Sequence, residues 1–167
     1  MVRFKHRYLL CELVSEDPRC RQCIEERAVS AAVKDAVART HGDFGLACCS
    51  IAFTVKYLNA YTGIVLLRCR KDFYQLLWSS LPFVTYLENK NQRYLCFFNT
   101  LHVGGTIRTC QKFLIQYNKS QLLQLLHSCT NEVERQAIQK SVLSCSLKEE
   151  EQFQEEEEDD LEETDST

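Results

Sequence analysis

The chain has 167 residues, of which 45% are hydrophobic and 26% are charged, a composition typical of a globular protein with one domain and an appendage. Its formal net charge of −3 combines two opposed parts: residues 147–167 hold twelve acidic side chains and one lysine, net −11, whereas the remaining 146 residues sum to +8. Five glycines and two prolines exclude a collagen-like or low-complexity body, no apolar run is long enough for a membrane span, and we do not expect the first residues to act as a secretory signal.

The first half of the chain alternates between strand and helix patterns. Residues 3–14 alternate in polarity as a strand does. A helix is expected over 24–41, where small apolar residues recur every three or four positions, with Gly42 as its C′ residue. Residues 46–57 and 61–70 both have strand patterns and are separated by a short turn, which predicts a β-hairpin with a central second strand.

The second half repeats this alternation and then becomes helical. From Lys71 an apolar stripe predicts a helix that ends or kinks at Pro82, and the polar stretch 87–93 is interpreted as a loop. A fourth strand is expected over 95–103. Two further helices are predicted at 107–126, with a break near 118–120, and at 131–143.

The order of these elements predicts the fold class. A β-α-β-β-α-β sequence is the split βαβ arrangement of ferredoxin-like folds, which RNA recognition motifs share. We therefore predict an α/β chain, an α+β sandwich of ferredoxin-like or RNA-recognition-motif-like type, with two additional C-terminal helices. This domain is expected to occupy residues 1–146, and residues 147–167 are expected to form a disordered acidic tail.

The turn after the fourth strand is the strongest local signal. Gly104 and Gly105 permit close backbone approach, Thr106 opens the next helix, and Arg108 and Lys112 add charge one turn apart. Such a turn can seat one phosphate, although the spacings of a dinucleotide fingerprint and of a Walker loop are missing. An ordinary strand-to-helix turn with a threonine cap explains the same residues equally well.

Cations also gather at two strand ends. In isolation each group is a solvated strand end, but together they supply much of the positive charge of the body, as expected where a nucleic-acid backbone binds. Aromatic residues near them could stack on unpaired bases or close the core. The predicted RNA-binding residues are Arg3, Lys5, His6, Arg7, Arg68, Arg70, Gly104, Gly105, Thr106, Arg108 and Lys112.

No catalytic or metal-binding pattern emerges from the sequence. Hydrolase and zinc-protease motifs are missing, and the four histidines are scattered. Cys20 and Cys23 form a single C-x-x-C without the second pair that zinc would need, so they are interpreted as loop cysteines. The ten cysteines are expected to be free thiols in a reducing compartment.

Three separated blocks carry a family resemblance. They are MVRFKHRYL at residues 1–9, YLNAYTGIVLLRCR at 57–70 and FFNTLHVGGTIRTCQK at 97–112. Together they closely resemble the Pop-five family of protein subunits of ribonuclease P and ribonuclease MRP, over roughly residues 1–145. The aromatic strand signature of sequence-reading RNA recognition motifs is missing, which favours contacts with RNA shape and phosphates.

The resemblance implies a noncatalytic RNA-binding subunit. Its partners would be the catalytic RNA and other protein subunits, with precursor tRNA nearby and no membrane contact. The RNA, with its own magnesium ions, would remove the 5′ leader of precursor tRNA, and ribonuclease MRP would process precursor rRNA. No cofactor would be bound by the protein itself, and the expected location is the nucleus and nucleolus.

Two other functions remain open at this point. The chain could be a protein–protein adaptor in the same particle, docking through the apolar face of the helices at 107–126 and 131–143. A stand-alone nuclease is the third hypothesis, which would require magnesium-dependent cleavage by the RNA-free chain.

Overall fold

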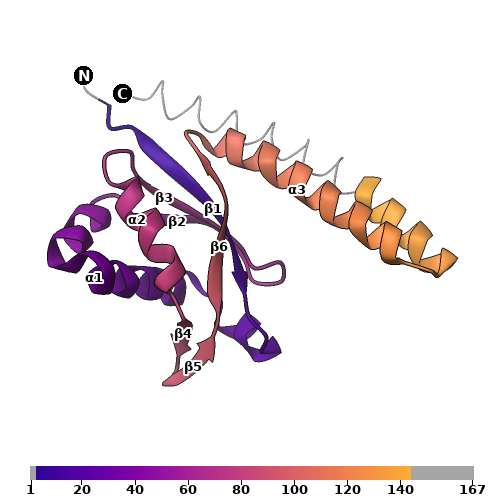
Figure 1. Cartoon of the computed structure of the whole chain (residues 1–167), viewed down its shortest axis with the longest axis horizontal. Helices are drawn as coiled ribbons and strands as arrows, with labels where there is room; N and C mark the ends of the chain where they lie inside the picture. Colours follow the sequence, from indigo (N-terminus) through magenta and orange to yellow (C-terminus); the bar gives the residue numbers. More distant parts are fainter. Residues whose placement is uncertain (1–2, 144–167) are drawn as a thin grey trace, which may run out of the picture. The chain divides into compact units, whose positions relative to one another are not determined.

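The computed structural model describes residues 3–143 and divides into two compact units, Met1–Cys110 and Gln111–Thr167 (Figure 1). We call these unit 1 and unit 2 and describe each by itself. The expected boundary at residue 146 and the expected acidic tail lie outside the described residues.

Unit 1 is built on a four-stranded antiparallel sheet. Its strands are β1 (His6–Val14), β2 (Thr54–Asn59), β3 (Ile64–Arg70) and β6 (Phe97–Gly104), in the spatial order β2-β3-β1-β6. β1 pairs with β3 on one side and with β6 on the other. The apolar run that begins at Ile64 is buried, which confirms the central position predicted for this strand.

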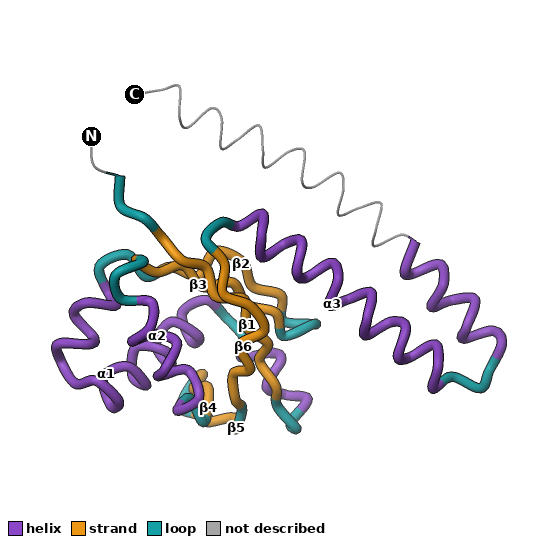
Figure 2. Tube along the Cα trace, turned by 45° about the horizontal axis from the view of Figure 1, so that its top comes forward, coloured by secondary structure: helices purple, strands orange, loops and turns teal. Residues whose placement is uncertain are grey.

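Two helices, α1 (Glu26–Ser50) and α2 (Tyr74–Ser80), lie on one face of this sheet (Figure 2). Alternate residues of β1 and β3 point toward them, because successive side chains of a strand face opposite sides. Fully burying one such Leu or Val side chain contributes roughly 1.5–3 kcal/mol to stability. The centre of this core is formed by Leu9, Cys11, Leu13, Val33, Ala36, Val37, Val65, Leu67 and Leu77. Short 3-10 helices, η1 (Pro18–Cys23) and η2 (Leu81–Phe83), complete the connections.

The prediction of a strand over 46–57 was wrong in its first half. Gly42 has φ 70° and ψ −164°, so it interrupts the helix as expected, but the chain then resumes helical geometry to Ser50. Gly45 and Cys49, four residues apart, are both buried, whereas Ala47 is exposed. This is the burial period of a helix, and the strand β2 begins only at Thr54.

The stretch 87–93, interpreted as a loop, is a hairpin. β4 (Tyr86–Asn89) pairs antiparallel with β5 (Gln92–Leu95) in a separate two-stranded sheet. Lys90 and Asn91, both at positive φ, form its turn. The fourth predicted strand, at 95–103, is β6.

The two additional helices are present. α3 (Ile107–Ser128) begins in unit 1 and is continuous in unit 2, without the break expected near 118–120. Residues 132–143 are also helical, and the Asn131 side chain accepts a hydrogen bond from the backbone N–H of Val133 at 3.3 Å, as a capping residue does. In the described part of the chain, no helix combines the length and apolar character that crossing a membrane requires.

Candidate nucleic-acid interface

Strand pairing brings the separated cationic segments together at one end of the main sheet. β1 begins where β3 ends, so that His6 lies opposite Arg70 and Tyr8 opposite Arg68. Tyr8 also lies opposite Gly104, at the end of β6. The backbone N–H of Lys71 donates to the carbonyl oxygen of Lys5 at 2.9 Å, which extends this pairing beyond the strands.

We call this region the cationic corner. It contains Lys5, His6, Arg7, Lys56, Arg68, Arg70 and Lys71, and Arg3 precedes Lys5 by two residues in the chain. Lys56 and Lys71 were not among the predicted site residues. Lys56 lies at an irregularity in β2, between Val55 and Tyr57, and only the pairing of β2 with β3 shows that it belongs here.

The side chains of the cationic corner lie on both faces of the sheet. Directly opposed residues on neighbouring strands share a face, so His6 and Tyr8 lie on the same face as Arg70 and Arg68. This face, opposite to the one on which α1 and α2 lie, is called the open face of unit 1 because neither of these helices covers it, although Leu10 and Leu66 further along the same face are buried. Arg7 points to the other side, where its Nη1 lies 3.5 Å from the position that a Cβ on Gly105 would take. Arg7 Nη1 also donates to the carbonyl oxygen of His6 at 3.1 Å.

Arg70 is held in place by its neighbours. Its guanidinium lies 4.1 Å from the ring centroid of Phe4 and 5.9 Å from that of Phe73, distances at which a cation is attracted to an aromatic face. Nη2 lies 3.6 Å from the carboxylate of Asp72, and only 18% of the Arg70 side chain is exposed. Arg70 is therefore a fixed positive charge rather than a freely moving surface side chain.

The pKa of His6 shows that several positive charges of the corner lie close to its side chain. Partial burial, followed by the positive charges of Arg68, Arg70 and Lys56, lowers the pKa of His6 from its ordinary value. The Nε atoms of Arg68 and Arg70 are buried and have no hydrogen-bond partner in the described structure. Crowding of like charges with little compensation favours an anionic ligand.

The turn between β6 and α3 is tightly packed and capped. A Cβ on Gly104 would lie 3.0 Å from Cys110 Sγ, so this position has little room for a side chain. The hydroxyl of Thr106 accepts a hydrogen bond from the backbone N–H of Thr109 at 3.2 Å, and the two threonine hydroxyls are also bonded to each other. Thr106 thus has the capping geometry that the sequence left as one of two interpretations.

The structure thus brings most of the predicted residues to one place. Arg3 and Lys5 are exposed where the chain leads into β1, and Arg108 is exposed on the first turn of α3. Lys112 lies in unit 2 and is not placed relative to the corner. The remaining predicted residues, His6, Arg7, Arg68, Arg70, Gly104, Gly105 and Thr106, lie at or next to the same end of the sheet.

The corner has groups suited to binding phosphates. Arginine donates in a planar fork that matches phosphate oxygens, and lysine supplies a compact charge. Among the residues described, no group of three His, Cys, Asp or Glu side chains is arranged to hold a metal ion. Cys20 and Cys23 are buried in η1 rather than in an open loop.

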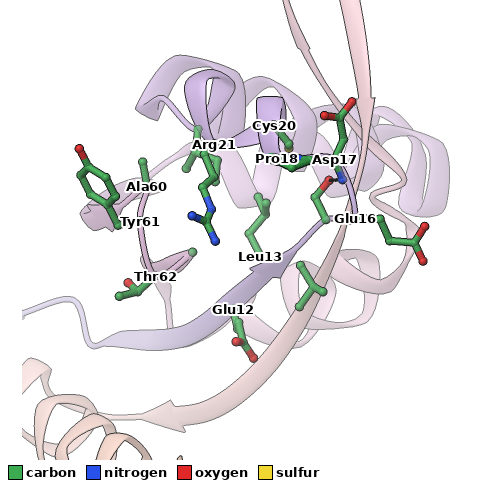
Figure 3. Close-up of a pocket in the computed structure, with 14 residues that line it drawn as sticks. Glu12, Leu13, Glu16, Asp17, Pro18, Cys20, Arg21, Ala60, Tyr61 and Thr62 are labelled. Atoms are coloured by element: carbon green, nitrogen blue, oxygen red, sulfur yellow. Dashed lines mark hydrogen bonds between the residues drawn. The ribbon is translucent and has the colours of Figure 1, made fainter. Parts of the chain in front are cut away.

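A cavity of about 390 Å³ lies at the other end of β1, between η1 and the loop that joins β2 to β3 (Figure 3). Glu12, Glu16, Asp17 and Arg21 contribute its charged lining. Asp17 is already engaged, because it accepts from the backbone of Arg19 at 2.9 Å and forms an ion pair with the Arg19 side chain. The cavity is separate from the cationic corner, and its charged lining is mostly acidic rather than basic.

Comparisons with known proteins agree with one another. A family model described as the Rpp14/Pop5 family matches residues 7–115. The chain is 73% identical over 157 residues to the Homo sapiens protein named Ribonuclease P/MRP protein subunit POP5, covering 93% of this chain and 96% of that one. The protein of the same name from Danio rerio is 56% identical over 149 residues, covering 88% of each chain. The protein from Schizosaccharomyces pombe is 28% identical over 131 residues, covering 73% of this chain and 91% of that one.

Among solved structures, a chain in the cryo-EM structure of yeast ribonuclease MRP is similar. The TM-score is 0.49 at 13% sequence identity, and the match covers 72% of this chain and 96% of that chain.

Proposed function

This chain belongs to the Rpp14/Pop5 family, and from that membership we propose that it is a noncatalytic protein subunit of ribonuclease P and ribonuclease MRP. The observation that carries the proposal is 73% identity, across 93% of the chain, to a protein named as a subunit of these particles. The chain is an accessory subunit rather than the catalyst, and its partners are the other components of the particle.

The cationic corner is the part of this chain that contacts RNA. Its arginines and lysines lie together at one end of the sheet, and such groups bind nucleic-acid backbones by releasing counterions. This contact is formed by Arg3, Lys5, His6, Arg7, Arg68, Arg70, Gly104, Gly105, Thr106 and Arg108. We also expect Lys112, on α3, to bind an RNA phosphate by itself. Phosphate contacts of this kind position a protein without reading base sequence.

The wider roles follow from the same proposal. The particle removes the 5′ leader of precursor tRNA and processes precursor rRNA, with magnesium ions held by the RNA and no cofactor on this chain. It works in the nucleus and nucleolus, with precursor tRNA near the corner. We assign unit 1 to the ferredoxin-like class, because the order β2-β3-β1-β6 with α1 after β1 and α2 after β3 fits that topology.

A second candidate is a protein–protein adaptor within the same particle. Apolar side chains in unit 2, Leu123, Leu125, Val133 and Leu143, are more than half exposed. Apolar surface of this kind is suited to a protein partner. Crosslinks from the assembled particle that reach only protein subunits, and no RNA, would favour this adaptor role over RNA contact.

Salt-dependent binding tests the RNA contact. Arg3 and Lys5 are exposed, so replacing both by alanine in the full chain removes charge with little effect on folding. We expect weaker binding to transcribed ribonuclease P RNA, and a plot of log affinity against log salt that is shallower by about two units, roughly one per lost phosphate contact. Filter binding between 50 and 300 mM salt, roughly the range over which such contacts weaken, measures both quantities.

The matched control is Arg27→Ala with Lys34→Ala. These two cations are exposed on α1, on the opposite side of the sheet from the open face, and their loss changes the net charge equally. We expect a smaller change in slope. Equal effects of the two double variants would show that only net charge matters and would contradict a localised RNA contact at the corner.

A further inference from the structure

We propose that His6, Arg68 and Arg70 form one binding site for an RNA phosphodiester group on the open face of unit 1, and that His6 takes up a proton when this group binds. The inference rests on the proposed RNA contact and deepens it. It assigns a binding role to His6 that differs from the general attraction exerted by the exposed cations Arg3 and Lys5.

The geometry of the sheet places these three side chains together. His6 and Arg70 are directly opposed on β1 and β3, and Arg68 lies one pleat further along the same face. Directly opposed side chains of an antiparallel pair have Cβ atoms about 4.5–5.5 Å apart, and diagonal neighbours about 7–8 Å. A phosphate group is small enough to lie among three side chains with this spacing.

The charges around His6 are almost all positive. Arg68 and Arg70 face it from β3 and Lys56 from β2, while Lys5 and Arg7 flank it in the chain. On β6, Gly104 lies opposite Tyr8 and carries no side chain. In the described part of the chain, the acidic side chain that pairs with this group of cations is Asp72, whose carboxylate lies 3.6 Å from Arg70 Nη2.

Arg68 and Arg70 differ in the contacts that their side chains make within the described structure. Arg70 is fixed by Phe4, Phe73 and Asp72, as described above. Arg68 forms no ion pair within the described structure, and its Nε is buried without a hydrogen-bond partner. Pairing Arg68 with an anion would compensate a charge that no ion pair among residues 3–143 compensates.

Binding of an anion reverses the electrostatic effect on His6. In the free chain, burial and the neighbouring cations lower the pKa of His6, so its imidazole is neutral near pH 7. A phosphate between the arginines cancels their repulsion and favours the imidazolium, which donates from both ring nitrogens. The pKa of His6 is then higher in the complex, and affinity rises as the pH falls through the interval between the free and bound values.

The decisive experiment follows the His6 ring by NMR in the full chain. The Cε1–Hε1 signal of His6, assigned by its loss in the variant His6→Gln, is titrated with pH before and after addition of transcribed ribonuclease P RNA. We expect a midpoint below the ordinary histidine value in the free chain and a clear upward shift with RNA. RNA that binds without moving this midpoint would overturn the phosphate site at His6 and leave the proposed function intact. No RNA binding at all would overturn both the phosphate site and the proposed RNA contact, and would favour the adaptor role.

Affinity measurements give an independent readout. For the wild-type chain we expect RNA affinity to increase by up to about tenfold per pH unit as the pH falls through the titration interval of His6, the limit for uptake of one proton. His6→Gln keeps a hydrogen-bond donor but should lose this pH dependence of affinity. The control variant His102→Gln, which changes a histidine on β6, should retain it.

An identical pH dependence of RNA affinity in His6→Gln and wild type would contradict the inference. So would an equal NMR shift produced by inorganic phosphate at the same phosphorus concentration, because the site would then bind an adventitious ion only.

Discussion

Gly63 shows how one residue joins two parts of unit 1. It lies in the loop between β2 and β3 at φ +72°, in the left-handed region that side chains disfavour. Its carbonyl oxygen accepts a hydrogen bond from the backbone N–H of Leu13 at 2.7 Å. A Cβ at this position would lie only 2.5 Å from the carbonyl oxygen of Leu13. Glycine is therefore needed both for the backbone conformation and for close packing against the end of β1.

Replacing Gly63 by alanine should destabilise the fold. The left-handed conformation alone costs an alanine about 1–2 kcal/mol, and the clash adds to this, so we expect a loss of at least about 2 kcal/mol in the free energy of unfolding. Urea unfolding followed by circular dichroism measures it. The control is Gly105→Ala, where the nearest atom, Arg7 Nη1, is 3.5 Å from the added Cβ; a change within about 0.5 kcal/mol is expected there. Similar losses in both variants would show that the contact with Leu13 does not matter.

At this scale the sequence identified the cations of the site but not their grouping. The alternation of the first strand separates Arg7 from His6, and only the register of β1 against β3 shows that His6 is the residue that meets Arg70 and Arg68. Lys56 joins them through a strand irregularity that has no clear signal in the sequence. Side-chain type is visible in a sequence, whereas proximity depends on pairing between segments more than fifty residues apart.

At the scale of elements, segments with a strong period were predictable and short ones were not. The strands at residues 3–14 and 61–70 and the long helix from Ile107 have enough repeats of the apolar pattern to identify them. The segment 46–53 alternates like a strand, yet its few residues also fit a helix with one buried face at Gly45 and Cys49. β4 and β5 have four residues each, too few to establish a period, and their turn lacks the usual glycine.

The turn between β4 and β5 has a backbone geometry that residues other than Lys90 and Asn91 adopt at lower cost. Lys90 and Asn91 have φ of 49° and 64°, as in the type I′ turns for which Asn-Gly is preferred. Replacing the pair by Asn-Gly should raise the free energy of unfolding by roughly 0.5–1 kcal/mol, because the left-handed conformation is less costly for these residues. Lys90→Ala, which removes the same charge but keeps the strained position, is the control and should give no such gain. A stability unchanged by Asn-Gly would mean that the hairpin unfolds independently of the core.

At the scale of the whole molecule, charge is separated along the chain. Residues 1–146 carry a net charge of +8 and residues 147–167 a net charge of −11, so the value of −3 describes neither part. The positive part contains the cationic corner, where several basic side chains meet at one end of the sheet. An acidic segment joined covalently to such a surface is present at a high effective concentration and can compete with RNA phosphates for it.

Truncation after Ser146 tests this competition. Without the acidic residues the chain retains its net charge of +8, and we expect it to bind a single-stranded homopolymer RNA roughly threefold to tenfold more tightly at about 50 mM salt. The difference should shrink as salt is raised, because the screening length falls from about 10 Å at 0.1 M to about 3 Å at 1 M.

A variant of the whole chain, with its twelve tail acids changed to the matching amides, separates the effect of charge from the effect of length. We expect it to bind like the truncated chain. If the amide variant binds like wild type while truncation tightens binding, the tail acts through its bulk rather than its charge. If all three chains bind alike at every salt concentration, the acidic segment does not compete with RNA for the corner.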